Sequence, residues 1–173
     1  MTPGTVFLDR DGVLNRKAPE GDYITTSGEV EVLPGAPEAL ARLNAAGARV
    51  VVVTNQRGVA RGRMTLSDLD AVNARLAALL APGRWDALYS CPHEGGACDC
   101  RKPGTGLFEQ ARAADPAIDF ADAAMVGDSP SDMQAGRALG LRTVLVGGGR
   151  GGGELADAVV PDLAAAVDRL VGR

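Results

Sequence analysis

The sequence predicts an α/β protein of the doubly wound class, in which helices cover both faces of a parallel sheet. Short β-branched runs alternate along the chain with segments whose apolar residues recur every three or four positions. The run Val50-Val51-Val52-Val53 is apolar throughout, which is typical of a strand buried on both faces. The length of 173 residues indicates one domain, because a division would leave pieces too small to bury a good core. We therefore expect a single domain over residues 1–173, without a large cap domain.

Strands and helices are predicted in alternation, and two long segments fall outside it. The predicted strands are residues 5–8, 49–54, 87–90, 124–127 and 143–146, and the predicted helices are residues 34–46, 65–80, 106–114, 131–139 and 161–171. Gly47 and Gly140 follow two of these helices, and Thr65 can cap a third. The glycine run at residues 147–153 predicts a mobile connection, although it could also cradle an anion. Residues 15–33 and 91–103 are too long for ordinary loops, so we expect both to have a function.

The composition excludes several classes of protein. With 46% apolar and 23% charged residues, the chain is too hydrophobic to be disordered. The net charge is −4, no long basic tract is present and aromatic residues make up only 3%, so we expect no nucleic-acid partner. Charged residues occur within the first ten positions, which leaves no room for a signal peptide, and the longest aliphatic run is residues 76–81. We expect a cytoplasmic monomer that does not bind membranes.

Motifs rich in polar residues stand at the ends of three predicted strands, where parallel sheets bind their ligands. They are Asp9-Arg10-Asp11-Gly12, Thr54-Asn55-Gln56 and Gly127-Asp128-Ser129-Pro130-Ser131-Asp132. Asp9 and Asp11 are two positions apart, which points both side chains to the same side of an extended chain. Clustered carboxylates repel one another unless a cation lies between them, and hard oxygen ligands suit Mg²⁺. The alternative is that these are separate surface aspartates that cap helices.

All the thiols and the only histidine lie in the segment 91–103. Cys91, His93, Cys98 and Cys100 form two close pairs, which match a closed, structural Cys₃His zinc site. The alternative is three reduced thiols and a loop histidine. Arg101 and Lys102 follow the last ligand directly, so a metal would position both cations. The Arg101 guanidinium can bind a phosphate or vicinal hydroxyls, and the Lys102 ammonium suits a transferring phosphoryl group.

The order and spacing of these motifs resemble the haloacid dehalogenase (HAD) superfamily, whose fold is Rossmann-like. The motifs are Asp9-Arg10-Asp11-Gly12, Thr54, Lys102, and Gly127-Asp128 with Asp132. The resemblance implies that Asp9 is the nucleophile of a phosphomonoester hydrolase and that Asp11 is the general acid and later the base. It also implies that Asp9, Asp11 and Asp128 hold a catalytic Mg²⁺, while Thr54 and Lys102 surround the transferring phosphoryl group. A carboxylate nucleophile divides one difficult hydrolysis into two steps through an aspartyl-phosphate.

Within the superfamily, the chain looks most like the heptose-bisphosphate phosphatases, with the histidinol-phosphate phosphatases as close relatives. Both groups carry such a zinc loop, but Asn15, residues 21–24 and residues 60–62 are more similar to the heptose enzymes. The resemblance implies a sugar phosphate substrate, and the expected substrate-binding residues are Asp22, Tyr23, Asn55, Gln56 and Arg101, with Arg101 at the non-reacting end. The chain departs from the family in its short zinc loop and in Ser129, which stands where a lysine is usual.

Three alternatives remain at this point. A histidinol-phosphate phosphatase, or another small phosphomonoester phosphatase, would use the same catalytic residues. A phospho-receiver domain also combines Mg²⁺, aspartate, threonine and lysine, but its phosphoacceptor would end an internal strand, whereas Asp9 follows the first predicted strand. A zinc-dependent nucleic-acid module is disfavoured by the acidic balance and the scarcity of aromatic residues.

Overall fold

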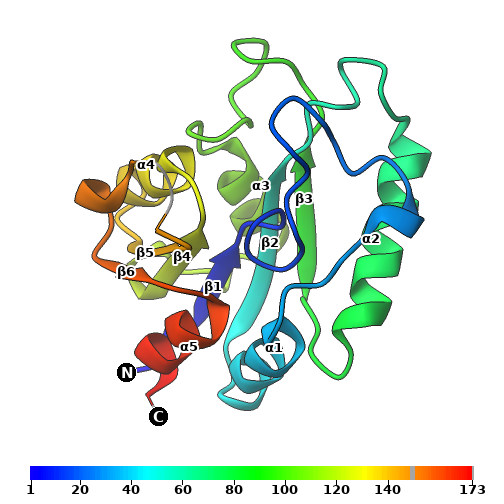
Figure 1. Cartoon of the computed structure of the whole chain (residues 1–173). Coiled ribbons are helices and arrows are strands. Elements are labelled where there is room, and N and C mark those ends of the chain that lie inside the picture. The colour runs from blue at the N-terminus through cyan, green and yellow to red at the C-terminus, as the bar shows by residue number, and fades with distance from the viewer. Residues whose placement is uncertain (149–150, 173) are drawn as a thin grey trace.

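The computed structural model describes residues 1–148 and 151–172 and contains a six-stranded parallel sheet in the order β3-β2-β1-β4-β5-β6 (Figure 1). The strands are β1 Thr5–Leu8, β2 Arg49–Asn55, β3 Ala87–Cys91, β4 Ala123–Gly127, β5 Arg142–Val146 and β6 Ala158–Val160. The helices are α1 Ala36–Ala45, α2 Leu66–Leu80, α3 Gly106–Ala114, α4 Pro130–Ala138 and α5 Leu163–Val171. The predicted doubly wound parallel sheet is confirmed.

Alternate residues of each central strand enter two separate cores. Val6 and Leu8 of β1 pack with α1, α5 and the end of α2, whereas Phe7 between them packs with α3 and α4 on the other face. This alternation follows from the period of two along a strand, and it explains why the central strands are apolar throughout. The sheet is therefore covered on both faces, with α1 and α5 in front of it and α3 and α4 behind it in Figure 1.

Half of the predicted boundaries match the structure, and the others differ from it by one or two residues. One strand was missed: β6 has only three residues, and a run that short does not stand out from a loop. Gly47 and Gly140 adopt positive φ after their helices, and Thr65 caps α2 by accepting a hydrogen bond from the amide of Asp68. In the glycine run, residues 149 and 150 lie outside the described residues.

The two long segments both pass over the carboxyl ends of the strands. Residues 15–33 contain one short 3₁₀ helix, Ser27–Glu29. Asn15 forms a bridge to Asp11, outside the segment, and another to Val32 near the segment's own end. Residues 15–33 lie at the same end of the sheet as the loop that follows β3, at the top of Figure 1.

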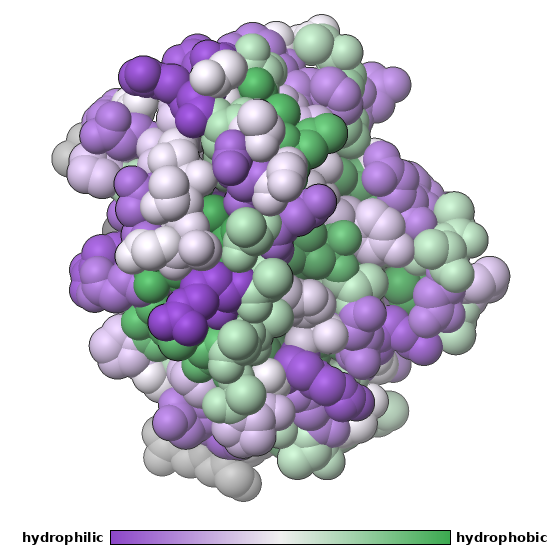
Figure 2. All heavy atoms as spheres, turned by 90° about the vertical axis from the view of Figure 1, so that its right-hand side faces the viewer, coloured by the Kyte–Doolittle hydropathy of each residue, from purple (hydrophilic) through white to green (hydrophobic). Residues whose placement is uncertain are grey.

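Seen from the side of α2, the surface mixes polar and apolar residues (Figure 2). No helix among the described residues is long and apolar enough to cross a bilayer.

Candidate active site and metal centres

The predicted site residues meet because the strands that carry them are parallel and in register. Asp9 directly follows β1, Thr54 and Asn55 end β2, and Asp128 directly follows β4. Leu8, the last residue of β1, pairs with Val52 of β2 and with Val126 of β4, so β4 ends one residue beyond β1 and β2 ends three residues beyond it. Together the residues line a cavity of about 220 Å³, which we call the aspartate cavity. Its lining comprises Asp9, Asp11, Lys17, Thr54, Asn55, Arg101, Lys102, Asp128, Ser129, Ser131 and Asp132.

A buried lysine joins two of the carboxylates of this cavity, those of Asp9 and Asp132. The Lys102 side chain is only 2% exposed, and its Nζ lies 2.8 Å from Asp9 Oδ1 and 2.6 Å from Asp132 Oδ1. Lys102 also donates to the carbonyl of Val53 at 2.7 Å. The side-chain amide of Asn55 positions this lysine, because it donates to the Lys102 carbonyl and accepts from the Lys102 amide, both at 3.0 Å. Asn55, predicted to bind substrate, thus also fixes the backbone of Lys102.

The electrostatics of the aspartate cavity favour a divalent cation. Carboxylate oxygens of Asp9, Asp128 and Asp132 lie within 4.8 Å of one another. Burial raises the pKa of Asp9 to about 7, although Lys102 opposes this increase, and burial also raises the pKa of Asp128. Asp128 Oδ1 is buried without a hydrogen-bond partner among the described residues. An unsatisfied carboxylate oxygen beside a second carboxylate fits Mg²⁺, which prefers hard oxygen ligands.

Gly12 allows the turn that follows β1 to pass close to Asp128, which follows β4. Its φ is +90°, a value that residues with a Cβ rarely adopt. A Cβ at this position would also collide with the Asp128 carboxylate. The glycine therefore lets the Asp9-Arg10-Asp11 segment turn beside Asp128.

The Asp11 carboxylate lines the aspartate cavity as predicted but is held separately from the other carboxylates. It accepts hydrogen bonds from Gln56 Nε2 and Asn15 Nδ2, both at 2.8 Å, and from Arg10 at 3.1 Å. Gln56 Nε2 also donates to Thr54 Oγ1 at 2.8 Å. Gln56, predicted to bind substrate, therefore fixes Asp11 and Thr54 relative to each other.

Three residues of the site were missed or had no role in the sequence analysis. Asp132 was noted only as part of a motif, but it pairs with Lys102 and accepts a 2.7 Å hydrogen bond from Ser129 Oγ at the start of α4. The spacing Ser-x-x-Asp is that of a capping box and could have indicated this bond. Arg10 is fully buried and reaches Asn73 of α2 at 2.8 Å. Lys17 Nζ lies 3.0 Å from Asp128 Oδ2. Lys17 therefore places a cation in the cavity, where Ser129 stands in place of the lysine that is usual in the family.

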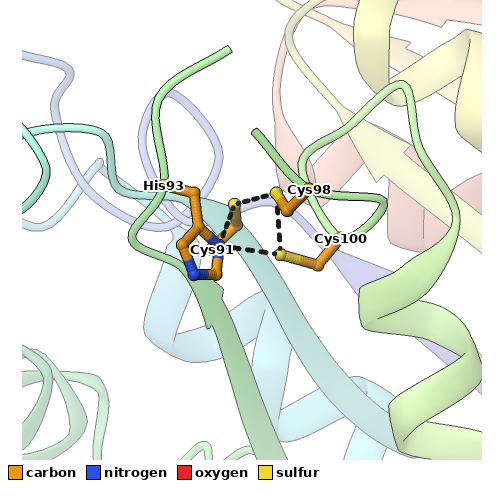
Figure 3. A group of neighbouring side chains, drawn as sticks. All are labelled: Cys91, His93, Cys98 and Cys100. Atoms are coloured by element: carbon orange, nitrogen blue, oxygen red, sulfur yellow. Dashed lines mark hydrogen bonds between the residues drawn. The ribbon is translucent and has the colours of Figure 1, made fainter. Parts of the chain in front are cut away.

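The predicted zinc ligands come together at the end of β3 (Figure 3). Four ligand atoms, from Cys91, His93, Cys98 and Cys100, lie within 4.8 Å of one another. Cys98 Sγ lies 3.5 Å from Cys91 Sγ and 3.2 Å from Cys100 Sγ, while His93 Nδ1 lies 3.3 Å from Cys100 Sγ. All three cysteines are free of disulfides. The pKa of Cys98 falls to about 6, chiefly because the Cys100 thiol donates a hydrogen bond to it. Three sulfurs and one imidazole nitrogen at this separation fit Zn²⁺.

A second cavity of about 250 Å³ adjoins the first, and we call it the loop cavity. It lies between residues 17–24, residues 55–57 and Asp11. Asp22 and Tyr23, predicted to bind substrate, line it together with Asn55 and Gln56. Arg101 instead lines the aspartate cavity, where its Nη1 is buried without a hydrogen-bond partner among the described residues and is available to an anion. A larger cavity of about 510 Å³ lies beside them, lined by residues of the 16–31 segment and Arg63.

Comparison with known proteins gives the family. Two family models match, "Haloacid dehalogenase-like hydrolase" over residues 6–73 and "HAD-hydrolase-like" over residues 99–170. The D-glycero-beta-D-manno-heptose-1,7-bisphosphate 7-phosphatase of Pseudomonas aeruginosa is 42% identical over 154 residues, which cover 87% of this chain and 85% of that protein. The chain belongs to the HAD-like hydrolases. The resemblance inferred from the motifs is confirmed.

Two further relatives bear on the chemistry. The D-glycero-alpha-D-manno-heptose-1,7-bisphosphate 7-phosphatase of Mycobacterium tuberculosis is 39% identical, over 88% of this chain and 84% of that protein. The crystal structure of D,D-heptose 1,7-bisphosphate phosphatase from Bordetella bronchiseptica, complexed with magnesium and phosphate, matches with a TM-score of 0.86 and 34% identity. This match covers 96% of this chain and 97% of that one. The expectation of a phosphatase of the HAD family is confirmed.

Proposed function

We propose that this HAD phosphatase removes the 7-phosphate of D-glycero-D-manno-heptose 1,7-bisphosphate. Relatives that the chain matches over most of its length carry this activity in their names. One observation carries the proposal: Lys102 holds the Asp9 carboxylate beside Asp128, at the end of the sheet where ligands bind.

In the first step, an Asp9 oxygen attacks phosphorus and the bond from phosphorus to the sugar oxygen breaks. Asp11 gives its proton to that leaving oxygen, and Gln56 and Asn15 hold the Asp11 carboxyl in place for the transfer. In the second step, Asp11 takes a proton from a water molecule that attacks phosphorus. The bond from phosphorus to Asp9 breaks, which releases inorganic phosphate and restores both carboxyl groups.

The negative charge on the phosphoryl oxygens requires several fixed cations and donors. Lys102, the Thr54 hydroxyl and the unpartnered Nη1 of Arg101 all line the same cavity and would bind these oxygens. Asp9 and Asp128 would hold Mg²⁺, which neutralises phosphoryl charge when bound. The Asp11 carboxyl, which the sequence analysis also placed among the Mg²⁺ ligands, lies outside this group and is left free for proton transfer. The magnesium and phosphate in the Bordetella structure support this part of the proposal.

We further propose a structural Zn²⁺ held by Cys91, His93, Cys98 and Cys100. The last ligand directly precedes Arg101 and Lys102, so the metal would fix the backbone from which both cations project. The rest of the loop already folds back on itself, because the amide of Gly106 donates to the carbonyl of Asp99 at 3.0 Å. A closed set of protein ligands provides no open position for chemistry.

A panel of substrates tests the proposed function. The values of kcat/KM are compared for both anomers of heptose 1,7-bisphosphate, for mannose and fructose bisphosphates, and for histidinol phosphate. Both anomers are needed because the names of the relatives include the alpha and the beta form. We expect one heptose anomer to rank first, with sustained phosphate release that Asp9→Asn abolishes. A higher value for histidinol phosphate would assign the protein to that activity instead.

A further inference from the structure

The loop cavity is where the body of the substrate must lie if the proposed function holds. Asp11 lines both cavities, so an oxygen that receives the Asp11 proton sits where the two cavities meet. The phosphoryl group occupies the aspartate cavity, and the rest of the molecule extends into the loop cavity. The non-reacting phosphate of a bisphosphate therefore needs a cation at the far side of the loop cavity.

Arg57 supplies a guanidinium at the rim of the loop cavity. It follows β2 by two positions, and its backbone is anchored on both sides. The amide of Gln56 donates to the Cys91 carbonyl at 2.7 Å, and the Arg57 carbonyl accepts from the amide of Arg61 at 3.1 Å. The Arg57 side chain is 35% exposed, so a ligand in the cavity can reach it.

The present contacts of the Arg57 guanidinium are long. Its Nε lies 3.3 Å from the Tyr23 hydroxyl and its Nη1 lies 3.4 Å from Glu94 Oε1. Glu94 forms its shortest bond with a different arginine, because Arg61 Nε lies 2.9 Å from Glu94 Oε2. Glu94 therefore remains paired if Arg57 turns toward a phosphate.

The other charged groups of the loop cavity are less suited to this task. Lys17 is paired with Asp128 at the aspartate cavity. Glu20 and Asp22 are carboxylates on the loop that faces the end of β2, and they would accept hydrogen bonds from sugar hydroxyls but repel a phosphate. The planar fork of an arginine binds phosphate oxygens in pairs.

We propose that Arg57 is a specificity-determining residue that binds the non-reacting phosphate and so selects bisphosphates over monophosphates. This inference rests on the proposed function. In the free protein, Tyr23 and Glu94 hold the guanidinium at the rim, and a bound bisphosphate replaces these two weak contacts with a charge-assisted pair.

The test compares Arg57→Ala with Arg61→Ala on heptose 1,7-bisphosphate and heptose 7-phosphate. Arg61 is a matched control, because it pairs with the same Glu94 but does not line the loop cavity. We expect Arg57→Ala to lower kcat/KM for the bisphosphate roughly 10- to 100-fold, mainly through KM, and to change the value for the monophosphate less than about threefold. Arg61→Ala should change neither value appreciably, and Arg57→Lys should recover part of the loss because it keeps the charge.

Equal losses on the two substrates, or an equal loss in Arg61→Ala, would overturn the proposal, since Arg57 would then serve the fold or the general chemistry. A wild-type protein that does not favour heptose substrates would instead overturn the proposed function. In that event, fructose 1,6-bisphosphate and fructose 6-phosphate provide the same comparison. A preference for the bisphosphate that does not depend on Arg57 refutes the inference there as well.

Discussion

Replacement of the nucleophile, Asp9→Asn, should stabilise the magnesium-free protein while it abolishes turnover. Burial raises the pKa of Asp9 from 3.8 to about 7. The folded protein therefore binds this proton more tightly than the unfolded chain does. The contribution of Asp9 to stability is fully present below its unfolded pKa of 3.8 and is lost as the pH rises to about 7. At higher pH, the ionised carboxylate opposes folding.

The size of this effect follows from the pKa difference. A pKa difference of one corresponds to about 1.4 kcal/mol. The ionised Asp9 carboxylate therefore lowers the free energy of unfolding by on the order of 4 kcal/mol at about pH 8. Only about 2 kcal/mol of this cost is present at about pH 5, because most of the Asp9 groups are still protonated in the folded protein. An asparagine avoids the cost, and Lys102 keeps Asp132 and the Val53 carbonyl as partners.

Urea unfolding in the presence of EDTA measures the effect. We expect the free energy of unfolding of Asp9→Asn to exceed that of the wild type, and the difference to grow by roughly 2 to 3 kcal/mol between about pH 5 and about pH 8. Excess Mg²⁺ should stabilise the wild type more than the variant. Asp70→Asn, at an exposed position of α2, is the control and should show no such trend. A difference that is constant with pH, or a less stable Asp9→Asn at about pH 8, would refute the reasoning.

Three further predictions concern the other groups of the site. Asp11→Asn should keep the fold but lower kcat by roughly 10²- to 10⁴-fold, because proton transfer to the leaving oxygen is lost; an unchanged kcat would remove Asp11 from the acid role. Metal analysis of protein purified under reducing conditions should find about one zinc per chain, and Cys98→Ser should lose it and melt at a lower temperature; zinc-free wild-type protein would contradict the Cys₃His site. Lys17→Ala should lower kcat/KM by about tenfold for bisphosphates and monophosphates alike, since Lys17 lies beside Asp128 and not at the distal end; a loss confined to the bisphosphate would place Lys17 there instead.

The sequence alone predicted the elements whose signals are local. The unbroken apolar strands and the helical periodicity between them are consequences of burial on both faces, and they led to the correct sheet and to the ends of β1, β2 and β4. The four zinc-type ligands lie within ten residues of one another, so their proximity hardly depends on the fold. β6 escaped notice because three residues are too few to establish a period.

Only the tertiary structure decided which partners the side chains of the site contact. Lys17 and Asp128 are 111 positions apart, and only the path of the 15–33 segment over the sheet brings them together. In the sequence, Asn55 and Gln56 look like amides that are free to bind a ligand. In the structure, Asn55 is hydrogen-bonded to Lys102 and Gln56 is hydrogen-bonded to Asp11. The approach of Arg57 to Tyr23 and Glu94 likewise depends on two loops that meet above β2. Strand ends can be placed from periodicity because the backbone repeats, whereas side-chain partners depend on long-range packing that no local pattern encodes.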